Sequence, residues 1–132
     1  TIDWEKCVEQ PSEEAQPFSY FNTQRTDRQT VKCFRTATNQ QTHDIVREYV
    51  HTLAPTTTDG VGPRYCPSLH KKVERFAERD SHVVWLEPEG LDTDLVYPNG
   101  ISTSLPISAQ KEFVESIQGL ENCVIEEFGY AV

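Results

Sequence analysis

Residues 60–86, GVGPRYCPSLHKKVERFAERDSHVVWL, contain a glycine-bearing loop, an amphipathic segment and a strongly apolar segment in direct succession. In residues 69–79 apolar side chains recur every three or four positions, which predicts a helix whose buried stripe comprises Leu69, Val73, Phe76 and Ala77. Residues 82–86, HVVWL, are almost continuously apolar, a pattern typical of a strand covered on both faces. A helix followed closely by a strand indicates a protein in which helices and strands are interleaved.

The alternation of helices and strands continues on either side of this run. A strand is expected at residues 31–36 and a helix at residues 42–53. Downstream, Ser108 can cap a helix that Gly119 ends. The other expected strands are residues 95–97 and 101–105, on either side of a Pro98-Asn99-Gly100 turn, and residues 122–125 and 128–132. We therefore expect a single domain over residues 1–132 with an α/β fold, or α+β as the alternative, built from a small mixed sheet and about three helices.

Composition argues against several classes of protein. The 132 residues include 21 acidic and 12 basic side chains, a net charge of −9, which disfavours a broad nucleic-acid-binding face because phosphate contacts need clustered Lys and Arg. No apolar run approaches the roughly 18 residues of a membrane span, and no signal-peptide pattern opens the chain. The cysteines form no C-x-x-C pair and are widely separated: Cys7, Cys33, Cys66 and Cys123. We therefore expect a soluble intracellular protein with reduced thiols.

The loop at residues 60–68 is the leading candidate for a binding site. A glycine-bearing loop that leads into a helix directs backbone N–H groups and the positive end of the helix dipole at whatever lies in front, which suits a phosphate. The same positive potential favours the thiolate of Cys66, and Arg64 can pair with a phosphate through its planar guanidinium. The structural alternatives are an ordinary loop with Ser68 as helix cap, a buried apolar role for Cys66, and a surface ion pair for Arg64.

A metal site is not indicated. No second ligand lies at metal-binding spacing from any of the histidines, His43, His51, His70 and His82, and His43 beside Asp44 is expected to mark a helix start. An acidic cluster lacks the order of a calcium-binding loop and indicates a hydrated turn: Glu87, Glu89, Asp92 and Asp94. The basic residues of the 69–79 helix are expected to form a solvated face or, secondarily, to hold phosphates: Lys71, Lys72, Arg75 and Arg79.

Several blocks of the chain together resemble one known family. They are GVGPRYCPS at 60–68, KVERFAERD at 72–80, LEPEG at 86–90 and YPNGISTSLP at 97–106, with TATN at 36–39 and THD at 42–44. These blocks resemble the glucose-inhibited division protein A family of FAD-dependent enzymes, which modify the wobble uridine of certain tRNAs at carbon 5 together with a partner GTPase. Matches at 1–4, 119–122 and 129–132 extend the resemblance over nearly the whole chain. We expect the chain to be a central piece of such a protein.

The resemblance implies which region of the parent protein this is. The family holds the FAD pyrophosphate in an N-terminal G-x-G-x-x-G turn, which this chain lacks. The chain would be the NADH-binding insertion region of a Rossmann-type FAD-dependent protein, with residues from about 86 to 132 returning to the FAD-binding domain. The residues that correspond to the family's NADH-binding segment are Gly62, Pro63, Arg64, Tyr65, Cys66, Pro67, Ser68, Leu69, His70, Lys71, Lys72, Val73, Glu74, Arg75 and Phe76.

The resemblance also implies roles for single residues and partners. Cys66 would act near the uridine as a nucleophile that adds to the pyrimidine ring. Asn99, Ser102 and Thr103 would face the flavin. The full-length protein would bind tRNA and a GTPase, form a homodimer, and work in a mitochondrion or alternatively in the bacterial cytoplasm, whereas the isolated region would be inactive. The rival interpretation is a non-catalytic acidic module that recruits a protein partner.

Overall fold

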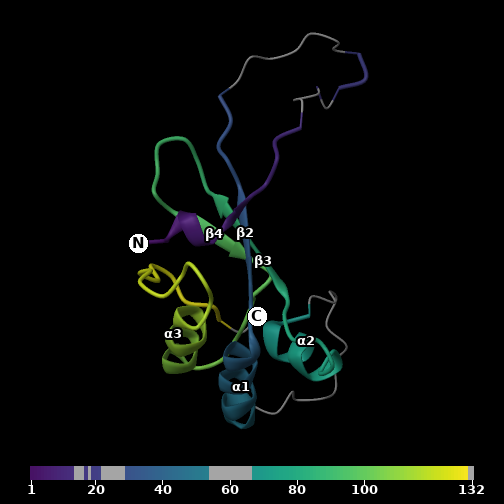
Figure 1. Cartoon of the computed structure of the whole chain (residues 1–132), viewed down its shortest axis with the longest axis vertical. Coiled ribbons are helices and arrows are strands. Elements are labelled where there is room, and N and C mark those ends of the chain that lie inside the picture. The colour runs from purple at the N-terminus through teal and green to yellow at the C-terminus, as the bar shows by residue number, and fades with distance from the viewer. Residues whose placement is uncertain (14–16, 18, 22–28, 54–66, 131–132) are drawn as a thin grey trace.

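The computed structural model describes residues 1–13, 17, 19–21, 29–53 and 67–130 (Figure 1). In chain order the elements are η1 (Trp4–Lys6), β1 (Val8–Glu9), β2 (Phe34–Ala37), α1 (Gln40–Tyr49), η2 (Val50–Thr52), α2 (Leu69–Arg75), β3 (Val83–Pro88), β4 (Val96–Asn99) and α3 (Ile107–Glu115), where η denotes a short 3-10 helix. The expected fold, strands interleaved with three α-helices, is confirmed. The loop at residues 60–66 lies outside the described residues.

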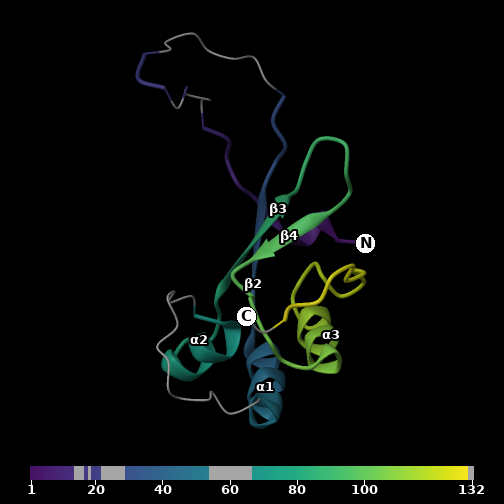
Figure 2. The same ribbon diagram turned by 180° about the vertical axis from the view of Figure 1, so that it is seen from behind.

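The strands form one sheet in the order β1-β2-β3-β4, and each described pair is antiparallel. Phe34 of β2, Leu86 of β3 and Pro98 of β4 are register partners and therefore share one face of the sheet. The three α-helices gather at one end of the sheet (Figures 1 and 2). The architecture is thus the α+β alternative, and the sheet, expected to be mixed, is antiparallel throughout its described part.

Strand β3 has one buried face, which corrects the expectation drawn from its apolar sequence. Val84 and Leu86 are fully buried, whereas Val83 is 46% exposed and Trp85 is half-buried. Side chains alternate between the two faces of a strand, and the core packs against the face that carries Val84 and Leu86. An antiparallel sheet can leave its other face open to solvent, as this one does at Val83.

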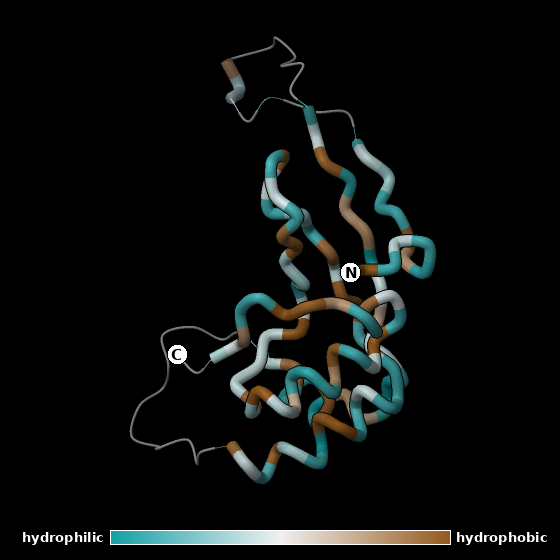
Figure 3. Tube along the Cα trace, turned by 90° about the vertical axis from the view of Figure 1, so that its left-hand side faces the viewer, coloured by the Kyte–Doolittle hydropathy of each residue, from teal (hydrophilic) through white to brown (hydrophobic). Residues whose placement is uncertain are grey.

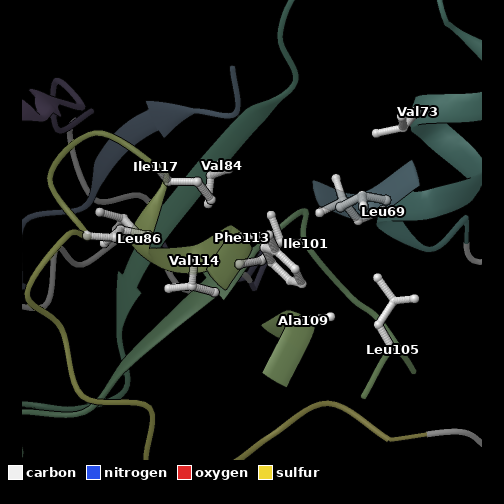
Figure 4. Packing of buried hydrophobic residues seen from close by; sticks show 12 residues of the cluster. Leu69, Val73, Val84, Leu86, Ile101, Leu105, Ala109, Phe113, Val114 and Ile117 are labelled. Carbon is white, nitrogen blue, oxygen red and sulfur yellow. The ribbon is translucent and has the colours of Figure 1, made fainter. Parts of the chain in front are cut away.

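One cluster of buried apolar residues lies where the helices meet the sheet (Figure 4). Helix α1 packs against both α2 and α3, and along the Cα trace apolar residues recur at intervals within the helices (Figure 3). The predicted helical stripes supply much of the core, although Ala77 is exposed. The cluster comprises Val46, Leu69, Val73, Val84, Leu86, Ile101, Leu105, Ala109, Phe113, Val114, Ile117 and Leu120.

Side-chain capping and local backbone geometry place the helix ends. Helix α1 begins at Gln40, before the expected Thr42, because Asn39 and Thr42 form a capping box. Asn39 Oδ1 accepts a hydrogen bond from the Thr42 amide at 2.9 Å, and Thr42 Oγ1 accepts one from the Asn39 amide at 3.3 Å. Helix α2 ends at Arg75, before the expected Arg79. No helix in the described ranges is long and apolar enough to cross a membrane.

The chain after β3 departs from the predicted hairpin. Pro98 and Asn99 belong to β4, which pairs with β3, and Gly100 follows with a φ of 112°. Residues 101–105 form no strand because Ile101 and Leu105 turn into the core. The hairpin therefore joins β3 to β4, and the Pro-Asn-Gly sequence marks the exit from its second strand.

The predicted strands at the C-terminal end are wrong over the described residues 122–130. This segment is held by a side chain instead of a strand edge. Gln110 Nε2 donates to the Gly129 carbonyl at 2.8 Å, and Gln110 Oε1 accepts from the Gly129 amide at 2.8 Å. Gln110 Nε2 also donates to the Leu105 carbonyl at 2.7 Å. The amide side chain thus satisfies the backbone groups that a neighbouring strand would otherwise satisfy.

Candidate functional site

Helix α2 is hydrogen-bonded to the segment that follows β4. The Leu69 amide donates to the Ser102 carbonyl at 2.7 Å, and Lys72 Nζ donates to the Gly100 carbonyl at 2.8 Å. Leu69 and Val73 turn into the core beneath these contacts. The structure therefore brings together two stretches that were predicted to serve different cofactors, the NADH-binding segment and the flavin-facing block.

The predicted NADH-binding residues divide into three groups. Gly62, Pro63, Arg64, Tyr65 and Cys66 lie outside the described residues. Leu69 and Val73 are fully buried and support the helix from within, so direct contact with a cofactor is restricted to the other residues. The residues with accessible surface are Pro67, Ser68, His70, Lys71, Lys72, Glu74, Arg75 and Phe76.

The start of α2 differs from a free phosphate cradle. Ser68 occupies the cap position, but its hydroxyl contacts the His70 ring at Nδ1, 2.9 Å away, and no side-chain cap bond forms. The Leu69 amide is already bonded to Ser102. Burial lowers the pKa of His70, which favours its neutral form. An anion at this end would therefore depend on side chains and on the preceding loop more than on the Leu69 amide.

Phe76 follows α2 and carries two guanidinium groups over its ring. Arg79 lies 4.7 Å and Arg75 lies 5.6 Å from the ring centroid, both within the range of cation–π attraction. The Phe76 ring also meets the His82 ring at an edge, with centroids 6.4 Å apart. Phe76 thus connects the exposed basic surface of α2 to a buried histidine.

A buried cluster of Thr38, His43 and His82 was not found by sequence reasoning. Thr38 Oγ1 lies 2.8 Å from His43 Nε2 and accepts from the His82 amide at 2.8 Å. The two imidazole rings are 5.1 Å apart. His43 is in the first turn of α1, as expected, but its ring meets that of a histidine from the start of β3. Within the described ranges no three His, Cys, Asp or Glu residues gather closely enough to hold a metal ion.

The three predicted flavin-facing residues differ in accessibility. Asn99 is exposed and its Nδ2 donates to Glu87 Oε1 at 3.4 Å. Ser102 is exposed, with its carbonyl bonded to α2. Thr103 is buried, and its hydroxyl accepts from the Leu105 amide at 3.1 Å, so this hydroxyl stabilises the turn into α3. Of these three residues, Asn99 and Ser102 are therefore the ones whose side chains a ligand could reach.

The described cysteines, Cys7, Cys33 and Cys123, are half-buried free thiols. Cys7 and Cys123 pack against the core, as expected for structural residues. Burial raises the pKa of both thiols, which disfavours the reactive thiolate. Cys66, for which the sequence predicts a reactive role, lies outside the described residues.

Gly100 is expected to resist substitution because it joins β4 to the α2 contact. Its φ is 112°, and a Cβ added there would lie 2.8 Å from the Val83 carbonyl oxygen. We expect Gly100→Ala to lower the free energy of unfolding of the chain by about 1–3 kcal/mol, measured by urea unfolding. Gly90→Ala is the matched control, because a Cβ there meets only Thr93 Cγ2 at 3.4 Å. Equal stability of the two variants would contradict the prediction.

Comparison with known proteins decides the family. The family model described as glucose inhibited division protein A matches residues 1–132. The chain belongs to this family. It is 50% identical over 135 residues to the tRNA uridine 5-carboxymethylaminomethyl modification enzyme MnmG of Zymomonas mobilis, covering 100% of the chain and 22% of that protein. It is 47% identical to the enzyme of the same name from Bdellovibrio bacteriovorus, covering 100% of the chain and 21% of that protein.

The fold of the glucose inhibited division protein A family is shared as well. The structure of Aquifex aeolicus GidA in one crystal form matches 96% of the chain with a TM-score of 0.79 and 35% identity, over 20% of its own length. A second crystal form matches 92% of the chain with a TM-score of 0.77 and 40% identity, over 22% of its length. The resemblance stated from sequence is therefore confirmed. The chain spans about a fifth of the length of these relatives.

Proposed function

We propose that this chain is the NADH-receiving region of an FAD-dependent enzyme that modifies the wobble uridine of tRNA at carbon 5. Membership of the family and the names of its relatives support the tRNA chemistry. The position of NADH is supported by one observation, the hydrogen bonds from α2 to Gly100 and Ser102. Two redox cofactors must meet for hydride transfer, and these bonds hold the two predicted cofactor segments against each other.

The accessible surface of α2 suits a dinucleotide. Lys71 and Arg75 are exposed basic side chains that can contact phosphates, and Glu74 between them can accept hydrogen bonds from ribose hydroxyls. Lys72 is half-buried and holds Gly100, so it positions the helix. Bound NADH would supply the hydride that reduces FAD. The chain itself would orient the dinucleotide, with Leu69 and Val73 anchoring the helix to the core.

Family membership supports the wider assignments within the same proposal. The FAD pyrophosphate would be held outside this chain, which has no G-x-G-x-x-G turn. Cys66 would serve as the nucleophile towards the uridine ring. A GTPase would be the protein partner, the full-length protein would be a homodimer, and its location would be a mitochondrion or, alternatively, the bacterial cytoplasm.

Replacing Arg64 with alanine in the full-length protein is expected to weaken NADH binding by about ten-fold or more. Hydrogen bonds to a charged group are worth about 1.5–3 kcal/mol, and a guanidinium can make two such bonds to one phosphate. The dissociation constant for NADH would be measured by fluorescence titration. Arg64→Lys is expected to recover part of the affinity, because it keeps the charge and loses the planar fork.

Arg47→Ala provides a matched control. Arg47 is an exposed arginine on α1 that pairs with Asp44 at 2.8 Å, and its removal should leave NADH affinity unchanged. If the full-length protein shows no response to millimolar NADH, the NADH assignment is wrong and a non-catalytic interaction module becomes the better interpretation. An equal loss of affinity in the Arg47 and Arg64 variants would contradict the specific role of Arg64.

A further inference from the structure

The cluster of Thr38, His43 and His82 comes from three separate parts of the chain. Thr38 follows β2, His43 is in α1, and His82 precedes β3. The His82 carbonyl accepts from the Thr38 amide at 2.9 Å, so the backbones of the first and last members are also joined. Through the edge contact of His82 with Phe76, the cluster reaches the C-terminal end of α2. A change in the charge or position of either imidazole can therefore alter the end of the helix that is proposed to receive NADH.

Two imidazole nitrogens of the cluster have no hydrogen-bond partner in the part of the chain that the structure describes. Thr38 Oγ1 accepts from the His82 amide and also lies 2.8 Å from Nε2 of His43, so this hydroxyl contacts both histidines. Among the described residues His43 Nδ1 and His82 Nε2 are buried and have no hydrogen-bond partner. His43 is 1% exposed and His82 is 9% exposed. Buried polar atoms are nearly always paired, so two orphans in one cluster require an explanation.

The surroundings of the pair disfavour a positive charge. Burial is the main cause that lowers the pKa of both histidines. Nearby cations act in the same direction, Arg47 on His43, and Lys72 and Arg79 on His82. The opposing carboxylates are Asp44 and Asp80 around His43 and Glu78 around His82. The two rings also disfavour each other's charge, because His43 lowers the pKa of His82.

We propose that His43 and His82 are positioning residues for α2, which hold Phe76 and the end of the helix while both rings are neutral and release them when the pair takes up one proton. The proposal rests on the proposed binding of NADH. A proton added to His82 Nε2 would place an unpaired N–H and a positive charge in a buried site beside Phe76. Relief of that cost requires the ring to move, and Phe76 with Arg75 and Arg79 moves with it.

The expected dependence on pH follows from the direction of the pKa shifts. A folded-state pKa below the unfolded value of about 6.5 means that the unfolded or released form binds more protons. The neutral, positioned state is therefore fully stable above about pH 6.5 and loses stability as the pH falls below it. One proton can change an equilibrium by at most about ten-fold per pH unit.

The test uses the full-length protein with ¹³C-labelled histidine and phenylalanine. We expect the His43 and His82 signals to titrate below about pH 6.5 and the Phe76 ring signals to shift with the same midpoint. Between about pH 6.5 and pH 5.5 the dissociation constant for NADH should rise by up to about ten-fold. His82→Phe keeps an aromatic ring that cannot titrate, and His43→Gln keeps an amide for Thr38. Each should reduce the change to less than about two-fold.

A control variant separates this pair from other histidines. His51→Gln changes an exposed histidine of η2 and should behave like the wild type. The proposal would be overturned if both His82→Phe and His43→Gln kept the wild-type pH dependence of NADH binding. It would also be overturned if the Phe76 signals did not follow the imidazole titration. Absence of NADH binding at neutral pH would overturn the proposed function, while the Phe76 titration would still decide the positioning role.

Discussion

Phe113→Ala is expected to lower the free energy of unfolding by about 3–5 kcal/mol, the largest effect of any single substitution considered for this chain. Phe113 is 1% exposed and, among the described residues, is the largest fully buried side chain. It projects from α3 into the cluster that α2, β3 and the segment after β4 share (Figure 4). Truncation removes the transfer free energy of the ring and leaves a cavity that close-packed neighbours can fill only in part.

Urea unfolding followed by tryptophan fluorescence measures the effect of Phe113→Ala. The matched control is Ile107→Ala on the same helix, because Ile107 is 54% exposed and should cost less than about 1 kcal/mol. A loss of stability at Phe113 no greater than that at Ile107 would show that α3 does not pack as described. An unchanged denaturant slope is expected, since the substitution should alter stability without altering the surface exposed on unfolding.

Gln110→Leu is expected to lower the free energy of unfolding by about 2–4 kcal/mol. The side chain is 4% exposed and makes three hydrogen bonds, one to Leu105 and two to Gly129. Leucine has a similar volume but cannot make them, so the loss combines about 1 kcal/mol per bond with the cost of unpaired backbone groups. Gly129 lies close against the turn at Thr103, since a Cβ added to it would lie 2.5 Å from the Thr103 carbonyl oxygen.

Local hydrogen exchange distinguishes the Gln110 interaction from a general loss of packing. In Gln110→Leu the Gly129 amide should exchange much faster than amides of the core strands. Gln110→Glu should have an intermediate effect, because it keeps an oxygen that can accept from the Gly129 amide and loses both donated bonds. The exposed Gln118→Leu is the control and should change stability by less than about 0.5 kcal/mol. Unaltered exchange at Gly129 would contradict the assigned role.

The helices were predicted well because the pattern that indicates a helix lies within a short stretch of the sequence. The apolar periodicity of residues 42–53, 69–79 and the segment from Ser108 to Gly119 requires one buried stripe, and any compact fold must cover that stripe. The ends of the helices were predicted less accurately, since capping bonds and helix propensity can favour end positions that differ by one or two residues. Asn39 starts α1 early through a reciprocal bond with Thr42, a pairing that the sequence carries but that the periodicity does not reveal.

Strands were predicted less well because a strand needs a partner. Residues 101–105 and 122–130 have the apolar content of strands, yet the former enter the core and the latter are held by Gln110. The apolar run of β3 indicated burial on both faces, but the antiparallel neighbours leave Val83 on an open one. Strand formation depends on contacts between distant segments, so composition alone cannot decide it.

Short motifs at specific spacing were enough to assign the family and to mark the segment around α2, because such motifs are read along the chain. Three other features arise only in the tertiary structure. They are the contact of α2 with Ser102, the inward position of the Thr103 hydroxyl, and the contact between His43 and His82. Each of them joins residues from different elements, or depends on the direction in which a side chain points. Packing of the three helices against one another at one end of the sheet sets those distances and directions, and no linear pattern encodes them separately.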